Sequence, residues 1–389
     1  MTVMSFMKKV AGAVIPQKTI LWDVPFQGIE GVPRILILSD HVNATYYATF
    51  HYTLQNLQAR GVADFAVLSG EGVRRNLLND EPREFVDRIV SQCLPHVVIF
   101  SRYATPRAEE LLESFHTRHV LTLYYSDDNL LDVPESLGQG VVKQHGAAEV
   151  LEARRFCLAN TSALLVSTSR LASVMRSKFP DKPIYQLLYP PYFGHLIERK
   201  PGEHRAPEGR PITIGYMGSR GHQRDLQMVV KAIARILDQF PWTRFETFGT
   251  IAMPDEFRRF GNRVAAHSPR NNYREFLQYL FELHWDIGLA PLEDTEFNRC
   301  RSTIKFLEYT ACDVTTVASD RCVYRSVIGA ESGLLTADGD WIAILEQVVT
   351  NQGLRSALLA NAKTTCADRF PLQKVADDLA RILTLAPSV

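Results

Sequence analysis

The sequence predicts an α/β protein built from two Rossmann-like doubly wound domains that face each other across a cleft. Three observations predict it: short apolar strands alternate with helical patterns from about residue 33 onward, the series of strands occurs twice, and a proline-rich segment separates the two series. The length of 389 residues exceeds what one hydrophobic core usually holds, which also favours two domains.

Five segments of strand length stand out in the first half, because each is apolar and is followed by a polar turn and a helical pattern. They are Arg34–Leu38, Asp64–Leu68, His96–Phe100, Val120–Tyr124 and Ala163–Ser167, and Tyr185–Leu188 could add a sixth. Strands joined through helices pair in parallel, so we expect one parallel sheet with helices on both faces.

The second half repeats this pattern after Tyr189–Pro211, a segment with five prolines and three glycines that has the composition of a linker. The last helix, about Leu372–Leu385, is apolar on one face and could close on either domain. We expect a first domain over residues 1–195, a linker over 196–210 and a second domain over 211–389, whose last helix could return to the first domain. The strands of the second half are expected at Ile212–Tyr216, Arg244–Phe248, Val264–Ala266, Asp286–Ala290 and Val314–Ala318.

The composition is that of a globular protein with balanced charge, since 46% of the residues are apolar and 43 basic residues match 43 acidic ones. This balance gives no overall electrostatic reason to expect nucleic acid as a partner. The six cysteines form neither a CxxC motif nor a Cys/His cluster with zinc spacing, so we expect free thiols in a cytoplasmic protein and no structural metal. No run of eighteen apolar residues could span a bilayer.

The first eighteen residues combine apolar side chains with Lys8, Lys9 and Lys18, and Pro16 would end any helix there. Such a segment is compatible with peripheral membrane contact through an amphipathic helix. The alternative, which we favour, is a terminal helix packed on the domain or a frayed chain end.

The most informative segment is Trp285–Ser319, which is predicted to form a strand, a polar loop, a helix and a second strand. The loop includes Glu296 and Asn298 and follows the carboxyl end of the first strand, where open α/β sheets bind ligands. Ser302 has the residue type of a helix N-cap, so we expect the helix to begin there.

Lys305 and Glu308 lie three residues apart near the start of this helix and so share one of its faces. A lysine can neutralise a phosphate and a glutamate can accept hydrogen bonds from a ribose diol, so the pair suits a sugar nucleotide. The alternative is a surface ion pair, which is common at this spacing. The segment alone does not decide between the two.

A second candidate site is the turn after the first strand of the second half, which carries Gly218, Ser219, Arg220 and Arg224. A glycine-bearing turn into a helix brings backbone N–H groups close to a phosphate, and either arginine could add charge. The spacing differs from the GxGxxG dinucleotide fingerprint, which argues against a dinucleotide-dependent oxidoreductase. The alternative is an ordinary turn with solvated arginines.

The first half offers Asp127 and Asp128, two carboxylates at the end of a predicted strand. They could orient sugar hydroxyls, bind a divalent cation or act as a base, or they could belong to a solvated turn. His41 and Asn43 are expected to face the same cleft, and His145 could face it too. A single histidine is more often structural than catalytic, so both histidines are secondary candidates.

In the order of these features the chain resembles GT-B glycosyltransferases of the family 4-like type (glycosyltransferase group 1). The resemblance is clearest from Ile212 to Leu335, where ITIGYMGSRGHQRDL resembles the phosphate loop and DIGLAPLEDTEFNRCRSTIKFLEYTACDVTTVAS resembles the donor site. It is weaker over residues 33–195, where YYSDDNLL stands in the place of a His-Asp pair. The family joins an acceptor-binding N-terminal domain to a C-terminal domain that binds the sugar nucleotide.

The resemblance implies that Glu308 binds the ribose, that Lys305 and an arginine of the glycine turn hold the diphosphate, and that the loop over 293–298 contacts the transferred sugar. Cys300 departs from the family, which commonly carries a first glutamate there, and CDVT at 312–315 replaces its usual Gly-Xaa-Pro. The implied catalytic residues are Asp127, Asp128 and Lys305, and the implied donor-binding residues are Gly218, Ser219, Arg220, Arg224, Glu296, Asn298, Ser302, Lys305 and Glu308.

These observations predict a glycosyltransferase that moves a sugar from a nucleoside-diphosphate donor to a hydroxyl of a glycan or lipid-linked acceptor, with retention by family resemblance and with no tightly bound metal or other cofactor. Two alternatives stay open. One is a non-catalytic subunit that binds a nucleotide or glycan, which the missing first glutamate favours, and the other is a sugar-nucleotide epimerase on the same fold. The expected location is the cytoplasm, with membrane association through the N-terminal segment as an alternative.

Overall fold

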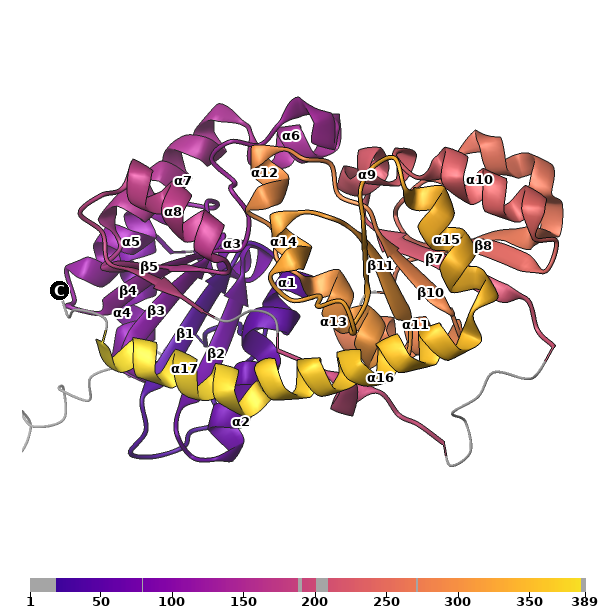
Figure 1. Cartoon of the computed structure of the whole chain (residues 1–389). Coiled ribbons are helices and arrows are strands. Elements are labelled where there is room, and N and C mark those ends of the chain that lie inside the picture. The colour runs from indigo at the N-terminus through magenta and orange to yellow at the C-terminus, as the bar shows by residue number, and fades with distance from the viewer. Residues whose placement is uncertain (1–18, 79, 188–190, 201–208, 271, 386–389) are drawn as a thin grey trace, which may run out of the picture.

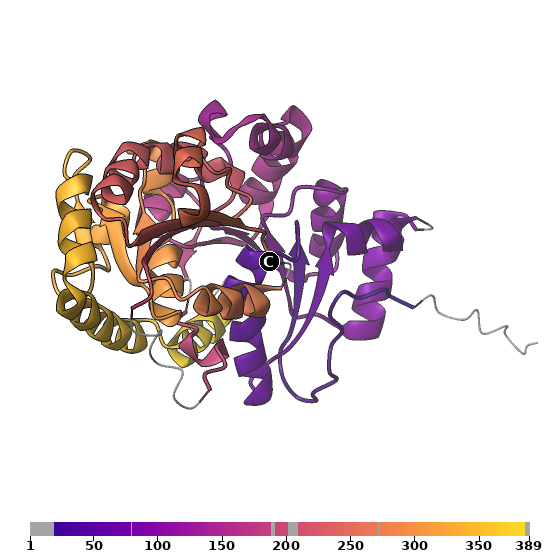
Figure 2. The same cartoon turned by 90° about the vertical axis from the view of Figure 1, so that its right-hand side faces the viewer.

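The computed structural model describes residues 19–78, 80–187, 191–200, 209–270 and 272–385. It contains two six-stranded sheets in which all neighbouring strands are parallel. Helices cover both faces of the sheets, as the view turned by 90° shows (Figure 2). The predicted fold class is therefore confirmed. The predicted amphipathic segment, residues 1–18, lies outside the described residues.

The first sheet has the strand order β2-β1-β3-β4-β5-β6, and it includes the sixth strand that the sequence left open. The strands are β1 (Arg34–Ser39), β2 (Asp64–Ser69), β3 (Val97–Ser101), β4 (Leu121–Ser126), β5 (Ala163–Val166) and β6 (Ile184–Gln186). The helical segments are α1 (Ala44–Tyr46), the π-helix η2 (Tyr47–His51), α2 (Tyr52–Ala59), α3 (Gly70–Leu77), α4 (Pro82–Cys93), α5 (Ala108–His116), η3 (Glu135–Leu137), α6 (Gln139–His145), α7 (Ala148–Asn160) and α8 (Ser169–Lys178).

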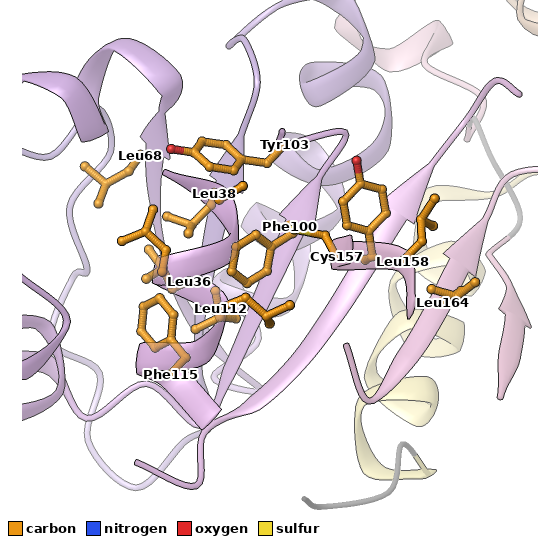
Figure 3. Packing of buried hydrophobic residues seen from close by; sticks show 14 of the residues in the cluster. Leu36, Leu38, Leu68, Phe100, Tyr103, Leu112, Phe115, Cys157, Leu158 and Leu164 are labelled. Carbon is orange, nitrogen blue, oxygen red and sulfur yellow. The ribbon is translucent and has the colours of Figure 1, made fainter. Parts of the chain in front are cut away.

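Both faces of the first sheet are apolar, because successive side chains of a strand point to opposite faces. Leu36 and Leu38 of β1 pack in one cluster with Phe100 and Phe115 (Figure 3). The alternating isoleucines of the same strand pack in a second cluster on the other face. This explains why the strands read as almost continuous apolar runs in the sequence.

The second sheet has the order β12-β11-β10-β7-β8-β9. Its strands are β7 (Ile212–Gly218), β8 (Thr243–Gly249), β9 (Val264–His267), β10 (Ile287–Ala290), β11 (Thr315–Ser319) and β12 (Leu334–Thr336). The sequence did not predict β12, because three residues are too few to show a period. The helical segments are η4 (Gly194–Leu196), η5 (Arg220–His222), α9 (Gln223–Gln227), α10 (Val230–Gln239), η6 (Asp255–Arg263), α11 (Tyr273–Glu282), α12 (Glu296–Arg299), α13 (Ile304–Ala311), α14 (Cys322–Arg325), α15 (Trp341–Thr350), α16 (Gln352–Arg369) and α17 (Leu372–Leu385).

The last helix returns to the first domain. Figure 1 shows α16 and α17 running along one side of both domains. Val375 and Leu379 of α17 are buried in the cluster that contains Ile35 of β1. Asp377 of α17 forms an ion pair with Arg60, 2.8 Å away at the end of α2.

The first residues of the predicted linker pack on the second domain and do not form an independent connection. Ile197 is buried in the cluster that contains Leu277 of α11. Arg199 Nη2 donates a hydrogen bond to the carbonyl oxygen of Ala311 at 2.7 Å. Residues 201–208 of the predicted linker lie outside the described part of the chain.

Candidate functional site

The candidate donor site lies where the strand order of the second sheet reverses. The chain leaves β7 toward β8 on one side, while β10, the neighbour of β7 on the other side, leads to β11. In open parallel sheets this topological switch point leaves a crevice at the carboxyl ends of the two strands. Gly218 ends β7 and Ala290 ends β10, so the two polar loops that the sequence singled out meet here.

Helix α13 is fixed over this point by Tyr309. Its hydroxyl donates to the carbonyl oxygen of Leu289 in β10 at 2.9 Å and accepts from the backbone N–H of Met217 in β7 at 3.2 Å. Gly288 provides the space, since a Cβ there would lie 2.7 Å from the Tyr309 ring. The two hydrogen bonds tie one turn of α13 to both strands of the switch point.

Lys305 and Glu308 are buried on α13, with 9% and 7% of their surfaces exposed. The surface ion pair that the sequence left as an alternative is therefore wrong. Tyr273 of α11 donates to Glu308 Oε1 at 3.0 Å. Burial raises the pKa of Glu308 to about 7, although this hydrogen bond and the charge of Lys305 act in the opposite direction.

Arg301 is the second cation beside Lys305. Burial lowers the pKa of Lys305 to about 8, and the positive charge of Arg301 adds to this effect. Among the described residues neither cation has a carboxylate within the 4.0 Å of an ion pair. The guanidinium of Arg301 instead contacts the ring of His222, with Nη1 at 2.8 Å from Nδ1 and 2.9 Å from Nε2. The two cations therefore lie together without a direct ion pair in the described part of the chain, although the more distant charges of Asp225 and Glu308 favour the charged form of the lysine.

His222 and Asp225 support Arg301 from η5 and α9. His222 Nδ1 lies 2.8 Å from Asp225 Oδ2, and burial followed by the charges of Arg301 and Lys305 keeps the pKa of the imidazole well below its usual range. In the neutral ring Nδ1 then donates to Asp225 and Nε2 accepts from Arg301. Asn298, expected to bind the donor, donates to the carbonyl oxygen of Glu293 at 3.0 Å and to Asp225 at 3.4 Å. Asn298 thus orders the loop after β10.

The two arginines of the glycine turn lie apart from this cluster. Arg224 forms an ion pair with Glu293 at 2.8 Å, and 59% of its side chain is exposed. Arg220 is exposed, and its backbone N–H donates to Thr250 Oγ1 at 3.1 Å. Gly218 and the exposed Ser219 form the end of β7 and the start of η5. The structure therefore places Arg301, and not Arg220 or Arg224, beside Lys305.

The helix start differs from the prediction as well. The N-cap position of α13 is Thr303, one residue after the predicted Ser302, and the cap makes no side-chain hydrogen bond. The prediction was wrong because Ser302 and Thr303 are adjacent and both have the residue type of an N-cap. Ser302 itself is partly buried between Arg301 and the helix.

Two contacts join this region to the first domain. Glu296, expected to contact the sugar, forms an ion pair with Arg170 of α8 at 2.7 Å. Thr168 Oγ1 donates to the carbonyl oxygen of Cys300 at 2.8 Å. Cys300 is fully buried and belongs to the apolar cluster of the first domain. The position where the resembled family has its first glutamate is thus part of the domain contact.

The carboxylates of the first domain have different surroundings. Asp127 lies 3.2 Å from Arg102 Nη1 and accepts a hydrogen bond from Thr45 Oγ1 at 3.1 Å. Asp128 is partly buried, and burial followed by the charge of Asp127 raises its pKa, while the charges of Arg301 and Arg102 lower it. Asp128 is therefore the carboxylate of the first domain that lies within electrostatic reach of the cationic cluster of the second.

His41, Asn43 and His145 come together in a pocket, as their shared cleft position predicted. The pocket lies at the carboxyl ends of β1 and β3, which is the switch point of the first sheet. Arg102, the residue after β3, belongs to its lining. The structure thus gives each sheet a polar site at its switch point.

Four site residues were not predicted as such: Arg102, His222, Tyr273 and Arg301. Arg301 stands directly before the predicted helix, and His222 lies in the glycine turn. Both residues therefore belong to the segments that resemble the donor site and the phosphate loop. Arg102 directly follows an apolar strand, and this position at the carboxyl end of a strand was the one indication that it could contact a ligand. Tyr273 lies 35 residues from its partner Glu308, and no local pattern indicates such a contact.

The described residues hold no group of three His, Cys, Asp or Glu side chains placed to bind a metal ion. Within the same residues, no helix has both the length and the apolar character that crossing a membrane requires.

Comparisons with solved structures agree with the two-domain architecture. HepE from Anabaena in complex with UDP and glucose is 13% identical with a TM-score of 0.62, over 90% of this chain and 99% of that one. Trehalose-6-phosphate synthase, in a study of glycosyltransfer with retention, is 12% identical with a TM-score of 0.57, over 92% and 100%. TarM is 10% identical with a TM-score of 0.52, over 74% of this chain and 54% of that one. No family model and no curated protein matches the sequence.

These similarities show the fold. The chain has the GT-B fold, in which two Rossmann-like domains face each other. At 9–13% identity the similarity is one of the arrangement of the elements, whereas the chemistry depends on the side chains at the two switch points.

Proposed function

We propose that the protein is a glycosyltransferase that moves a sugar from a nucleoside-diphosphate donor to a hydroxyl group of an acceptor. The observation that carries the proposal is the pair of cations Lys305 and Arg301, which are held at the switch point of the second sheet without an ion-pair partner among the described residues. Arg301 and Lys305 repel each other across the site, and an anion that contacts both would relieve this repulsion.

A diphosphate is an anion that could contact both Lys305 and Arg301. Lys305 and Arg301 would bind its oxygens and stabilise the negative charge that develops as the bond from the sugar carbon to the diphosphate oxygen breaks. A bond from that carbon to the acceptor oxygen forms, and the hydroxyl gives its proton to a carboxylate. We assign this role to Asp128, which lies within electrostatic reach of Arg301. Asp127 has a positioning role, since Arg102 and Thr45 engage its oxygens.

Glu308 is proposed to bind the ribose. Tyr273 engages Oε1, so Oε2 is available to accept from a ribose hydroxyl. Because HepE and trehalose-6-phosphate synthase are described with UDP and with retention, respectively, we propose UDP as the nucleotide and retention as the stereochemical course. We further propose that Glu296 contributes to closure of the two domains through Arg170 rather than to sugar binding.

The test is a thermal-shift and calorimetric titration with UDP, GDP, ADP and CMP, followed by incubation with sugar derivatives of the nucleotide that binds. We expect UDP to stabilise the protein and its sugars to be slowly hydrolysed when no acceptor is present. Glu308→Gln should weaken UDP binding by about 1.5–3 kcal/mol, as for the loss of a charged hydrogen bond. The matched control is Glu331→Gln, because Glu331 is exposed and lies between α14 and β12, outside the elements that form the site.

The alternative of a non-catalytic subunit has one observation in its favour, since Cys300 replaces the first glutamate of the resembled family and is buried. UDP binding without hydrolysis or transfer of any sugar would favour that alternative. Absence of binding by all four nucleotides would overturn both. Conversion of the donor sugar without transfer would favour the epimerase.

A further inference from the structure

A basic surface lies at the end of the second domain that is remote from the first domain. It is formed by Arg235 of α10, Trp242 and Arg244 at the start of β8, and Arg259 and Arg263 of η6. Figure 1 shows α10 and β8 at this end of the molecule. Trp242 stands directly before β8 and Arg263 directly before β9, so the basic surface lies at the amino ends of these strands. The proposed donor site lies at the opposite edge of the sheet, at the carboxyl ends of the strands.

Side-chain contacts hold the segments of the basic surface together. Arg263 Nη1 donates to the carbonyl oxygen of Leu237 in α10 at 2.7 Å. Arg244 Nη2 donates to the carbonyl oxygen of Asn262 in η6 at 3.1 Å. The guanidinium of Arg263 also lies over the ring of Phe260, 5.2 Å from its centroid. Because these contacts join α10, β8 and η6, the arginines are positioned before any partner binds.

The basic surface carries an excess of positive charge. Residues 230–244 and 255–263 contain six lysines and arginines and three carboxylates, although the charges of the whole chain balance. Asp238 forms an ion pair with Arg259 at 2.6 Å. The hydrogen bond from Arg259, together with the charges of Arg259, Arg263 and Arg235, holds the pKa of Asp238 below its usual value. Three arginines thus act on one carboxylate, and such a surface on a neutral protein favours an anionic partner.

Trp242 gives the basic surface an apolar component. Its side chain is 53% exposed, and it is the one exposed phenylalanine, tyrosine or tryptophan among the residues that the structure describes. The indole packs edge-on against Phe240, with 5.4 Å between the ring centroids. The turn beneath it is closed by the backbone N–H of Thr243, which donates to the carbonyl oxygen of Phe240 at 2.9 Å. An indole held in water in this way is of the kind that enters the interface between water and a bilayer.

A membrane with anionic lipids fits this arrangement better than a nucleic acid does. Single-stranded nucleic acid is bound in grooves where several aromatic side chains stack on successive bases, whereas the basic surface exposes one tryptophan. A bilayer needs no groove, because headgroup phosphates can contact arginines while one tryptophan enters the interfacial layer. An arginine can also keep its charge at the level of the headgroups while its stem packs on apolar neighbours, and Arg259 lies over Phe260 at 4.3 Å in this manner.

We propose that the basic surface binds a membrane that contains anionic phospholipids, with Trp242 in the interfacial layer and Arg235, Arg244 and Arg263 against headgroup phosphates. This contact involves none of the first eighteen residues, and it places the second domain on the bilayer. The donor site, at the opposite edge of the sheet, stays accessible to a donor in solution. The proposal does not depend on the proposed function, because membrane binding requires neither donor nor acceptor.

The experiment measures how much of the full-length protein sediments with sucrose-loaded vesicles. The vesicles consist of phosphatidylcholine alone or of phosphatidylcholine and phosphatidylglycerol in equal parts. We expect binding to the anionic vesicles only, and weaker binding as the salt concentration rises, because salt screens the attraction. Arg235→Gln should weaken this binding roughly fivefold, the value of one basic residue near an anionic surface. The tryptophan fluorescence of the wild type should shift to shorter wavelength on binding, and Trp242→Phe should abolish the shift.

Two matched controls lie on the first domain. Arg176→Gln makes the same change on an exposed arginine of α8, and Leu78→Ser removes a more exposed apolar side chain than Trp242. Both should bind vesicles like the wild type. Because Arg235 and Trp242 are exposed, their variants should unfold at the wild-type urea concentration, which separates a loss of binding from a loss of structure.

Three results would overturn the proposal. The first is a wild-type protein that does not sediment with the anionic vesicles at low salt. The second is equal binding by Arg235→Gln and Arg176→Gln together with an unchanged fluorescence shift in Trp242→Phe. The third is tighter binding, per negative charge, to heparin or single-stranded DNA than to the vesicles, which would assign the basic surface to a polyanion in solution. None of these results bears on UDP binding, so the proposed function stands or falls separately.

Discussion

The two sheets carry basic side chains at corresponding places, but only that of the first sheet has a direct ion-pair partner among the described residues. At the switch point of the first sheet Arg102 has Asp127 at 3.2 Å. At the switch point of the second sheet Lys305 and Arg301 have no such partner within the described residues, and the charge of Arg301 lowers the pKa of Lys305 against the more distant charges of Asp225 and Glu308. Removing one member of a buried ion pair is costly, whereas two neighbouring cations without a direct partner favour a bound anion.

The largest expected effect is on stability, at the ion pair between Arg102 and Asp127. Arg102→Met leaves the Asp127 carboxylate, whose side chain is 9% exposed, without its cation. We expect a loss of about 2–4 kcal/mol of unfolding free energy, measured by urea denaturation. Arg102→Met combined with Asp127→Asn should recover part of the loss. The account of this cluster is wrong if Arg102→Met is as stable as the wild-type protein.

The corresponding change in the second domain should cost less stability. Lys305→Met keeps the volume of the side chain and removes a buried charge that Arg301 repels and that Asp225 and Glu308 attract, so the ligand-free protein should lose less stability than it does in Arg102→Met. UDP binding should weaken by about 1.5–3 kcal/mol. Denaturation and calorimetry on the same preparation check both parts. A marked loss of stability would mean that Lys305 is structural.

The pH dependence sharpens the same contrast. Because the pKa of Lys305 is lowered to about 8, the lysine loses its charge as the pH rises through that value. UDP affinity should therefore fall between about pH 7 and pH 9, as measured by calorimetry. Lys305→Arg, which stays protonated, should reduce this dependence. The sign is reversed for stability: between pH 8 and the unfolded value near 10.5 the folded chain binds fewer protons, so the free energy of unfolding rises with pH.

A smaller effect is expected at Tyr273, which orients Glu308. Tyr273→Phe removes the hydrogen bond to Oε1 and should weaken UDP binding by about 0.5–1.5 kcal/mol. It should also raise the pKa of Glu308 further, because that hydrogen bond favours the ionised form. Tyr279→Phe on the same helix is the control, since Tyr279 contacts His267 instead. Equal affinities in the two variants would remove Tyr273 from the site.

The smallest effect is expected at the contact between the domains. Glu296 and Arg170 are about half exposed, with 45% and 49% of their side chains accessible. Glu296→Gln should change stability by less than about 1 kcal/mol and leave UDP binding unchanged. If this variant binds UDP normally but loses affinity for the UDP sugar, Glu296 contacts the transferred sugar after all.

The sequence predicted the fold and the place of the donor site better than the identity of the site residues. Apolar runs such as Arg34–Leu38 report burial on both faces of a sheet, which is a local property, so the strands were found almost within their observed limits. Lys305 and Glu308 were found because their spacing puts them on one helical face. Tyr273 was missed because its contact with Glu308 depends on how α11 packs against α13.

The arginines show the same limit. Arg220 and Arg224 were preferred because they lie in a turn of the phosphate-loop type, yet Arg224 is engaged by Glu293. Arg301 lies beside Lys305 because the loop after β10 passes η5, where the guanidinium of Arg301 contacts the ring of His222. Which of several nearby arginines reaches a site is decided by such tertiary contacts, and one sequence does not reveal them.

The most direct test of the central claim compares UDP with uridine, by calorimetry, in the wild-type protein and in Lys305→Met. The diphosphate is the part of UDP that the two cations should bind, so we predict that UDP binds the wild type at least tenfold more tightly than uridine does, by about 1.5 kcal/mol or more. In Lys305→Met most of this advantage should disappear, while uridine affinity stays the same. Equal affinities of UDP and uridine for the wild type, or an unchanged advantage in the variant, would contradict the assignment.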